Sequence, residues 1–275
     1  MPGHDEETKM SPDLYDLLVL ALRMAITAAF VISASIITER SGPAIGALIA
    51  TLPISAGPSY VFLALDHDAA FIAQGALASL PINAATILMG TIYVVLAQRF
   101  GVAISLPAAL LAWLACGVAV RSFPWTLAGG ILANIGVLAI CLPVVQRFRA
   151  AKMPLIVRRW YDIPLRAALV ATLVATVVTL SHWVGPTVSG IIALFPVVYS
   201  SLMLILQPRI GGPATASVIA NGSWGLIGFA IAIVMLHLGA LYLGSATALS
   251  LALATGVTWN LGLWRFGRRK HLRAS

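Results

Sequence analysis

Long apolar stretches constrain this chain more than any other feature of its sequence. A helix needs about 20 apolar residues to cross the hydrocarbon core of a bilayer. Hydrophobic residues make up 60% of the chain and charged residues only 9%, whereas a soluble domain carries about a quarter charged residues. The runs are too long for a membrane β-barrel and do not alternate. The sequence therefore predicts an all-α polytopic membrane protein of about nine transmembrane helices, at residues 17–38, 43–65, 69–97, 102–119, 125–145, 163–181, 186–206, 212–236 and 240–263.

One twelve-residue phrase occurs twice in the chain. Residues 42–53 read GPAIGALIATLP and residues 185–196 read GPTVSGIIALFP, at an offset of 143 residues and with five identities. Arg23 and Arg166 share the same offset. Such a match, which includes Arg, Gly and two Pro, indicates an internal duplication. We expect the first four spans to form one copy and the last four to form the second, joined by the fifth span as a linker helix.

The distribution of Lys and Arg predicts how the copies lie in the membrane. Basic residues crowd the loop at 146–160 and the tail at 265–275, and both should therefore be cytoplasmic. Counting spans backwards places the N-terminus outside, with Arg121 as the one basic residue in an outside turn. The first copy then starts outside and the second inside. The sequence thus predicts two inverted four-helix repeats related by a pseudo-two-fold axis in the membrane plane, an arrangement common in transporters.

These patterns divide the chain into five segments. The first residues lack the basic start of a signal peptide, so we expect them to be retained as a short tail. The segments are a disordered N-terminal tail (1–12), the first four-helix repeat (13–120), the linker helix with the basic cytoplasmic loop (121–162), the inverted second repeat (163–264) and a basic cytoplasmic tail (265–275).

Proline and hydroxyl residues at mid-depth suggest a solute site between the repeats. Pro53 and Pro196 lie about ten residues into their spans, near the bilayer midplane. A proline inside a helix frees a carbonyl and kinks the helix, so we expect a kink at each proline, with Ser55 and Tyr199 close by. In the first copy Gly57 and Pro58 follow Pro53, and we expect a broken or strongly bent helix there. The alternative is that these prolines only shape helix packing.

One asparagine in the third span of each copy extends this hypothesis. Asn83 and Asn221 would add hydrogen-bonding amides to the prolines and make a neutral polar pocket. Buried amides need partners, so the alternative is that they form helix–helix hydrogen bonds, as Asn134 in the linker span could.

Charged residues near the span ends have two interpretations. Arg23 and Arg166 could be gates that attract an anionic solute from opposite faces, or could simply snorkel to the headgroups. Asp66-His67-Asp68 could hold a metal or act as a base, but a solvated loop explains it equally well. No acidic residue lies at mid-membrane, which argues against proton coupling through a buried carboxylate.

The spacing of a few motifs is similar to that of a known family. Tyr15-Asp16, Leu22-Arg23, Gly42-Pro43 and Pro53 recur as Tyr161-Asp162, Leu165-Arg166, Gly185-Pro186 and Pro196. This pattern resembles uncharacterised bacterial membrane proteins of the small four-helix GlpM-like type, here doubled. The resemblance implies an integral protein of the bacterial inner membrane. The inverted arrangement is more distantly similar to drug/metabolite carriers, whose membrane glutamate this chain lacks.

The sequence favours a secondary transporter or permease for a small solute, with its site at the repeat interface and alternating access between the copies. The alternative is a non-transport scaffold or accessory protein in envelope biogenesis. We find no phosphate loop, zinc spacing or nucleophile motif, so we expect neither an enzyme nor a metal or other cofactor. Membrane lipid and an unidentified solute are the expected partners, nucleic acid is not, and a homodimer is compatible with this interpretation.

Overall fold

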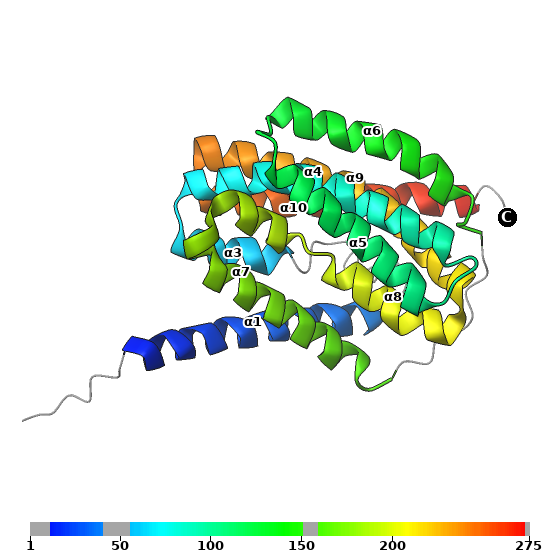
Figure 1. Ribbon diagram of the computed structural model, residues 1–275, viewed down its shortest axis with the longest axis horizontal. Coiled ribbons are helices and arrows are strands. Elements are labelled where there is room, and N and C mark those ends of the chain that lie inside the picture. Colours follow the sequence, from blue (N-terminus) through cyan, green and yellow to red (C-terminus); the bar gives the residue numbers. More distant parts are fainter. Residues whose placement is uncertain (1–11, 41–55, 151–158, 273–275) are drawn as a thin grey trace, which may run out of the picture.

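The computed structural model describes residues 12–40, 56–150 and 159–272, and within them it contains helices and turns but no strand (Figure 1). Seven helical stretches of the described chain are long and apolar enough to cross a membrane. This confirms an all-α polytopic membrane protein. The helices are α1 (Pro12–Arg40), α3 (Ala56–Asp66), α4 (Ala69–Leu96), α5 (Val102–Arg121), α6 (Leu127–Gln146), α7 (Asp162–Ala193), α8 (Val197–Ile210), α9 (Gly212–Leu243) and α10 (Ser245–Leu272).

Helix α7 folds back on itself at Gly185. This residue has φ +74° and ψ 177°, a conformation that glycine adopts without steric cost. Ser181, just before the turn, bonds His67 at the start of α4, whereas Asp162 at the other end of α7 bonds Arg209 at the end of α8. The segments before and after Gly185 therefore run in opposite directions, as Figure 1 also shows. The Gly185-Pro186 pair thus opens a new helical segment, as the sequence predicts.

That new segment is broken at Pro196. Helix α7 ends at Ala193 and α8 begins at Val197, because proline lacks the N–H that would continue the ladder and disfavours a helical conformation at Phe195. The segment nevertheless continues past the break along α4, with Gly190 against Gly75 and Tyr199 against Gly90. It is therefore a broken helix that keeps its direction. The corresponding predicted break near Pro53 lies outside the described residues.

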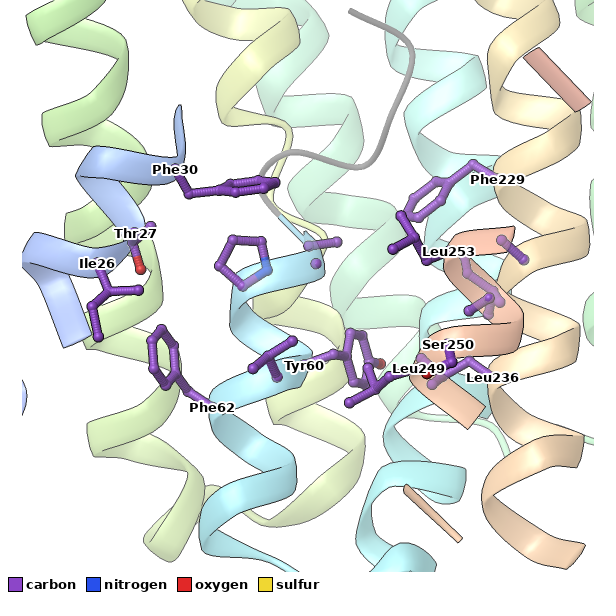
Figure 2. A pocket seen from close by; sticks show the side chains of 17 residues that line it. Ile26, Thr27, Phe30, Tyr60, Phe62, Phe229, Leu236, Leu249, Ser250 and Leu253 are labelled. Atoms are coloured by element: carbon purple, nitrogen blue, oxygen red, sulfur yellow. The ribbon is translucent and has the colours of Figure 1, made fainter. Parts of the chain in front are cut away.

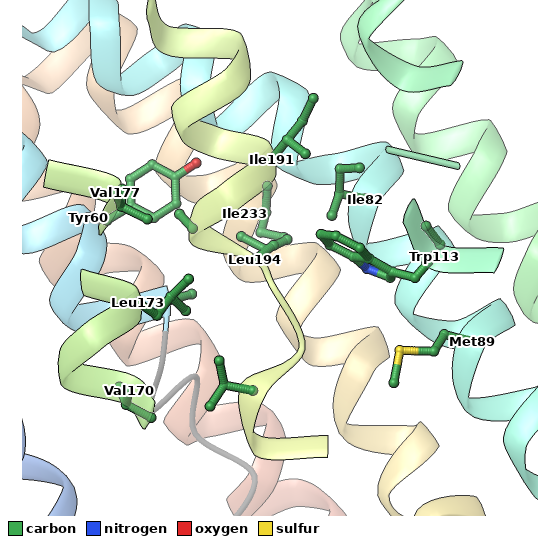
Figure 3. Packing of buried hydrophobic residues seen from close by; sticks show 14 of the residues in the cluster. Tyr60, Ile82, Met89, Trp113, Val170, Leu173, Val177, Ile191, Leu194 and Ile233 are labelled. Carbon is green, nitrogen blue, oxygen red and sulfur yellow. The ribbon is translucent and has the colours of Figure 1, made fainter. Parts of the chain in front are cut away.

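The unwound residues of this break are shielded by protein. Leu194 and Pro196 are buried, and the ring of Phe195 packs edge-on against Trp113 with 5.3 Å between the ring centroids. Irregular backbone is tolerated at membrane depth only where protein or water, rather than lipid, surrounds it. Figure 3 shows Leu194 and Trp113 within the same buried cluster as Ile82 and Ile233.

Helices α4 and α9 form the centre of the molecule and run antiparallel. We call the residue 143 positions later in the chain the mate of a first-half residue. Asn83 on α4 donates a hydrogen bond to the carbonyl of its own mate, Leu226 on α9, at 3.1 Å. Seven residues beyond Asn83, Gly90 contacts Ile219, which lies seven residues before Leu226. Contacts between the two helices are thus mirrored about the Asn83–Leu226 pair.

The boundaries of the helices follow the same offset. Helix α9 begins at Gly212, the mate of Ala69 where α4 begins, and α10 begins at Ser245, the mate of Val102 where α5 begins. Gly244, which stops α9 with φ +84°, is the mate of Gly101, the residue before α5. The offset of 143 residues found in the repeated phrase therefore continues without a gap through the later helices.

One ion pair connects two helices at each end of the molecule. Arg23 on α1 binds both carboxylate oxygens of Asp66 at the end of α3, at 2.5 and 2.6 Å. Arg209 at the end of α8 binds both oxygens of Asp162 at the start of α7, at 2.7 Å each. Arg209 is the mate of Asp66, so the two halves use the same position with opposite charge.

The basic segments gather at one end of the long axis. In Figure 1 the C-terminal end of α10 and the end of α6, which precedes the basic loop, both lie at the right, whereas α1 begins at the left. His67 and His182 lie together at the end opposite the basic loop, beside the start of α4. This grouping matches the one predicted from the Lys and Arg distribution. The bilayer face that each end meets stays a prediction.

Candidate functional site

A pocket of about 400 Å³ lies between the first-half helices α1 and α3 and the second-half helices α9 and α10 (Figure 2). The first turn of α3, Ala56-Gly57-Pro58, presents only small side chains to it. Pro58 is tolerated there because the first helical turn makes no use of its missing N–H. A methyl group built on Gly57 would meet no atom of the described residues within 4 Å.

The wall of the pocket is almost entirely apolar. Its large side chains include Ile26, Phe30, Phe62, Phe229 and Leu253. None of the described residues that line the pocket is charged. The wall therefore offers mainly apolar contacts to a bound molecule.

The few hydroxyl groups of the pocket already have partners. Thr27 donates to the Arg23 carbonyl at 2.8 Å and Ser250 to the Ala246 carbonyl at 3.0 Å, each within its own helix. The Tyr60 hydroxyl lies 2.6 Å from Ser79, which in turn donates to the Gly190 carbonyl. A polar solute would thus find few groups ready to replace its lost water, and burial of an unpaired polar group is costly.

The corresponding region on the other side of the α4–α9 centre is filled. Tyr199, the mate of Ala56, packs between Gly90 and Gly222. Leu173 is 8% exposed, whereas its counterpart Phe30 in the pocket is 49% exposed. Among the described residues, Tyr199 and Leu173 are thus packed against neighbours, whereas their mates Ala56 and Phe30 line the pocket.

Asn83 makes hydrogen bonds between helices. It donates to the Asn134 side chain on α6 at 2.8 Å as well as to Leu226 on α9. Asn134 donates to the carbonyls of Leu80 and Gly130. Asn83 is fully buried, and its own side-chain oxygen has no hydrogen-bond partner. The amides therefore tie the linker helix α6 to the centre, which is the alternative that the sequence left open.

Asn221 lies in different surroundings. Its side-chain oxygen accepts from Arg149 Nε at 2.8 Å, and its amide nitrogen donates to the Ser217 carbonyl at 2.8 Å. Arg149 follows α6, at the basic end of the molecule. Asn221 thus contacts the start of the basic loop, one to two turns from the Asn83 contact on the same helix.

The residues predicted to bind solute do not form a single polar pocket in the described chain. Gly57 lines the apolar pocket, whereas Pro196 and Tyr199 belong to the filled side. Pro53 and Ser55 lie outside the described residues. Arg23 is held by Asp66, and Arg166 lies half-buried on α7 one turn after Asp162. Whether any of them handles a solute stays a prediction.

The side chains that do line the pocket gave no signal in the sequence. Phe30, Phe62 and Phe229 are apolar residues within apolar spans, and single-sequence patterns do not distinguish a cavity wall from a lipid-facing surface. Comparing each residue with its mate gives one signal for the pocket, because the small residue Ala56 corresponds to the large residue Tyr199.

The three residues Asp66-His67-Asp68 serve structural roles. Asp66 binds Arg23, Asp68 caps α4 by accepting from the Phe71 N–H at 2.8 Å, and His67 stacks on Phe71 with 3.8 Å between centroids. Burial lowers the pKa of His67, and the nearby His182 lowers it further, while Asp66 and Asp68 act in the opposite direction. No group of three potential metal ligands occurs among the described residues.

Comparison with known proteins adds no relative. No family model, no curated protein and no solved structure matches this chain.

Proposed function

We propose that this chain is a secondary transporter for a small solute, built from two inverted repeats that open alternately on either side of the α4–α9 centre. The proposal rests chiefly on one observation, the cavity of about 400 Å³ at the boundary of the two halves beside a filled counterpart. In inverted-repeat carriers access alternates largely by rigid-body rocking of one repeat against the other around a fixed site. A single open side is what one state of such a cycle would look like.

The geometry of the halves supports the inverted duplication. Helix α4 is antiparallel to its counterpart α9, their contacts are mirrored about Asn83 and Leu226, and the later helices begin at mates. A rotation about the membrane normal would instead leave counterparts parallel. With α3 as the end of a span, and with the segments before and after Gly185 counted separately, the chain would cross nine times. The N-terminus would then lie outside and the C-terminus in the cytoplasm of a bacterial inner membrane.

Distances between spin labels test the alternation. Labels at Ile26→Cys on α1 and Ala254→Cys on α10 span the pocket, and labels at their counterparts Leu169→Cys on α7 and Leu111→Cys on α5 span the filled side. Cys116 and Cys141, which are both free thiols, are replaced by alanine in this background. In lipid nanodiscs each pair should give two distances, and conditions that shorten one pair should lengthen the other.

A pair within one repeat is the control for this experiment. Val95→Cys on α4 and Leu111→Cys on α5 are both exposed and lie on adjacent helices of the first half. This pair should keep a single distance, because each repeat moves as a unit. One narrow distance for both inter-repeat pairs under all conditions would contradict transport and favour a rigid scaffold.

A further inference from the structure

We infer that the transported solute is a single-chain amphiphile whose hydrocarbon chain enters the pocket between α1, α3, α9 and α10 from the bilayer. The inference rests on the proposed function and names the chemical class of the solute. It follows from three features, namely the direction in which the pocket opens, the chemistry of its wall and the ion pair at its edge.

The pocket opens sideways, through residues that face the lipid. Ile26, Val61 and Leu253 line it and are 51%, 45% and 55% exposed. Ile26 and Leu253 lie inside the apolar runs Leu14–Ile36 and Ser245–Arg265, which are long enough to span a bilayer. A molecule already dissolved in the lipid can therefore reach the pocket without crossing water.

The wall selects a hydrocarbon chain. Its described residues carry no charge, and the Thr27 and Ser250 hydroxyls are bonded to their own helices. A charged or strongly polar group would lose its hydration there without compensation, whereas a methylene chain gains about 0.8 kcal/mol per buried CH₂ on leaving water. A volume of about 400 Å³ lies near the lower end of the range of about 300–1,000 Å³ for ligand pockets. This size favours one chain over two.

The edge of the pocket offers a place for a polar head. Phe62 lines the pocket, and the guanidinium of Arg23 lies 5.6 Å from its ring centroid while binding Asp66. Arg23 precedes the pocket residue Thr27 by one helical turn. An ion pair beside an otherwise uncharged cavity distinguishes one end of a bound molecule from the other, and so fits an amphiphile better than a plain hydrocarbon.

Photochemical capture tests the inference. The full-length protein in phosphatidylcholine nanodiscs is irradiated with a sixteen-carbon fatty acid that carries a diazirine at mid-chain, and the adducts are mapped by mass spectrometry. We expect adducts to concentrate on pocket residues of α1, α3 and α10. Gly57→Phe, which places a ring in empty space, should lower this capture at least fivefold, and Ala252→Phe should do the same from α10.

Val118→Phe is the matched control, because Val118 lies on α5 away from the pocket and is exposed to lipid. It should leave capture unchanged. Adducts spread evenly over all lipid-facing helices, with no effect of either pocket variant, would identify an ordinary lipid shell only and overturn the inference. If the two inter-repeat label pairs change distance in opposite directions but the fatty acid is not captured, the proposed transport is supported and this solute class is excluded. If the fatty acid is captured specifically but each inter-repeat label pair keeps one narrow distance, the binding site is supported and the proposed transport is contradicted.

Discussion

Gly190 packs directly on the backbone of Gly75, where the segment after Gly185 meets α4. A methyl group at Gly190 would overlap the Gly75 carbonyl, and neither backbone can move without disturbing the centre of the bundle. Overpacking of this kind costs about 1–3 kcal/mol. Gly190→Ala should therefore lower the thermal midpoint of the purified protein in detergent. Gly136→Ala, on an α6 face where a methyl group meets nothing within 4 Å, should leave it unchanged or higher.

The buried Asn83 amide makes a second prediction at the residue scale. Asn83→Leu removes the donor to both Asn134 and Leu226 and leaves a buried amide oxygen unpaired. A buried acceptor without a donor costs about 1–3 kcal/mol, so the free energy of unfolding in detergent should fall by about that amount. Asn221→Leu should cost less, because Asn221 is exposed. Equal losses for the two variants would show that α6 is not held by this amide.

The sequence indicated which residues are unusual, but not which partners they have. Asn83 and Asn221 occupy similar places in their spans, yet one bonds Asn134 and the other bonds Arg149. Partners of this kind depend on how the linker helix α6 packs, and α6 has no counterpart in the other half.

At the scale of elements, the ion pair between α1 and α3 should tolerate reversal. In the second half Arg209 stands at the position equivalent to Asp66, and it pairs with Asp162, which lies four residues before Arg166, the mate of Arg23. Arg23→Asp and Asp66→Arg should each destabilise the protein, because each leaves two like charges side by side. The double variant should recover most of the thermal midpoint. A double variant as unstable as the worse single variant would mean that the surroundings, rather than the pairing, fix the sign of each charge.

The loop between α3 and α4 should make stability sensitive to acid. Burial keeps the folded-state pKa of His67 below its ordinary value of about 6.5. Its contribution to stability is then complete above about pH 6.5 and is lost as the pH falls through the lowered folded-state pKa. The thermal midpoint should thus drop on acidification below about pH 6.5, and His67→Gln should reduce that drop. An unchanged drop in this variant would assign it to other groups.

Element boundaries were largely predictable where glycine and proline set them. The opening at Gly185 agrees with the sequence prediction, because this residue acts through local backbone geometry. At Pro196 the sequence predicted a kink, whereas the helix is interrupted between Ala193 and Val197. The end of α9 was placed too early, at 236, because apolar residues continue to Leu243 and only the backbone at Gly244 stops the helix. A run of apolar side chains does not by itself indicate where one helix ends and the next begins.

At the scale of the whole molecule, the all-α membrane architecture was predictable and the pocket was not. Long apolar runs are a property of the sequence, whereas the inverted duplication stays a prediction, although α9 and α10 begin 143 residues after α4 and α5. The pocket depends on differences between mates, such as Ala56 against Tyr199, and on four helices that are distant in the chain. The predicted solute site was inferred from prolines and polar residues, of which Pro53 and Ser55 lie outside the described residues, whereas the described wall of the pocket is mostly apolar.

The central claim is that the two halves cross the membrane in opposite senses, and the sidedness of two mates tests it most directly. Ala70 at the start of α4 and Pro213 at the start of α9 are mates, and both are exposed. In cells that express the protein without Cys116 and Cys141, Ala70→Cys should react with a membrane-impermeant maleimide from outside. Pro213→Cys should react only after the membrane is permeabilised. Labelling of both positions from the same side would contradict the inverted duplication.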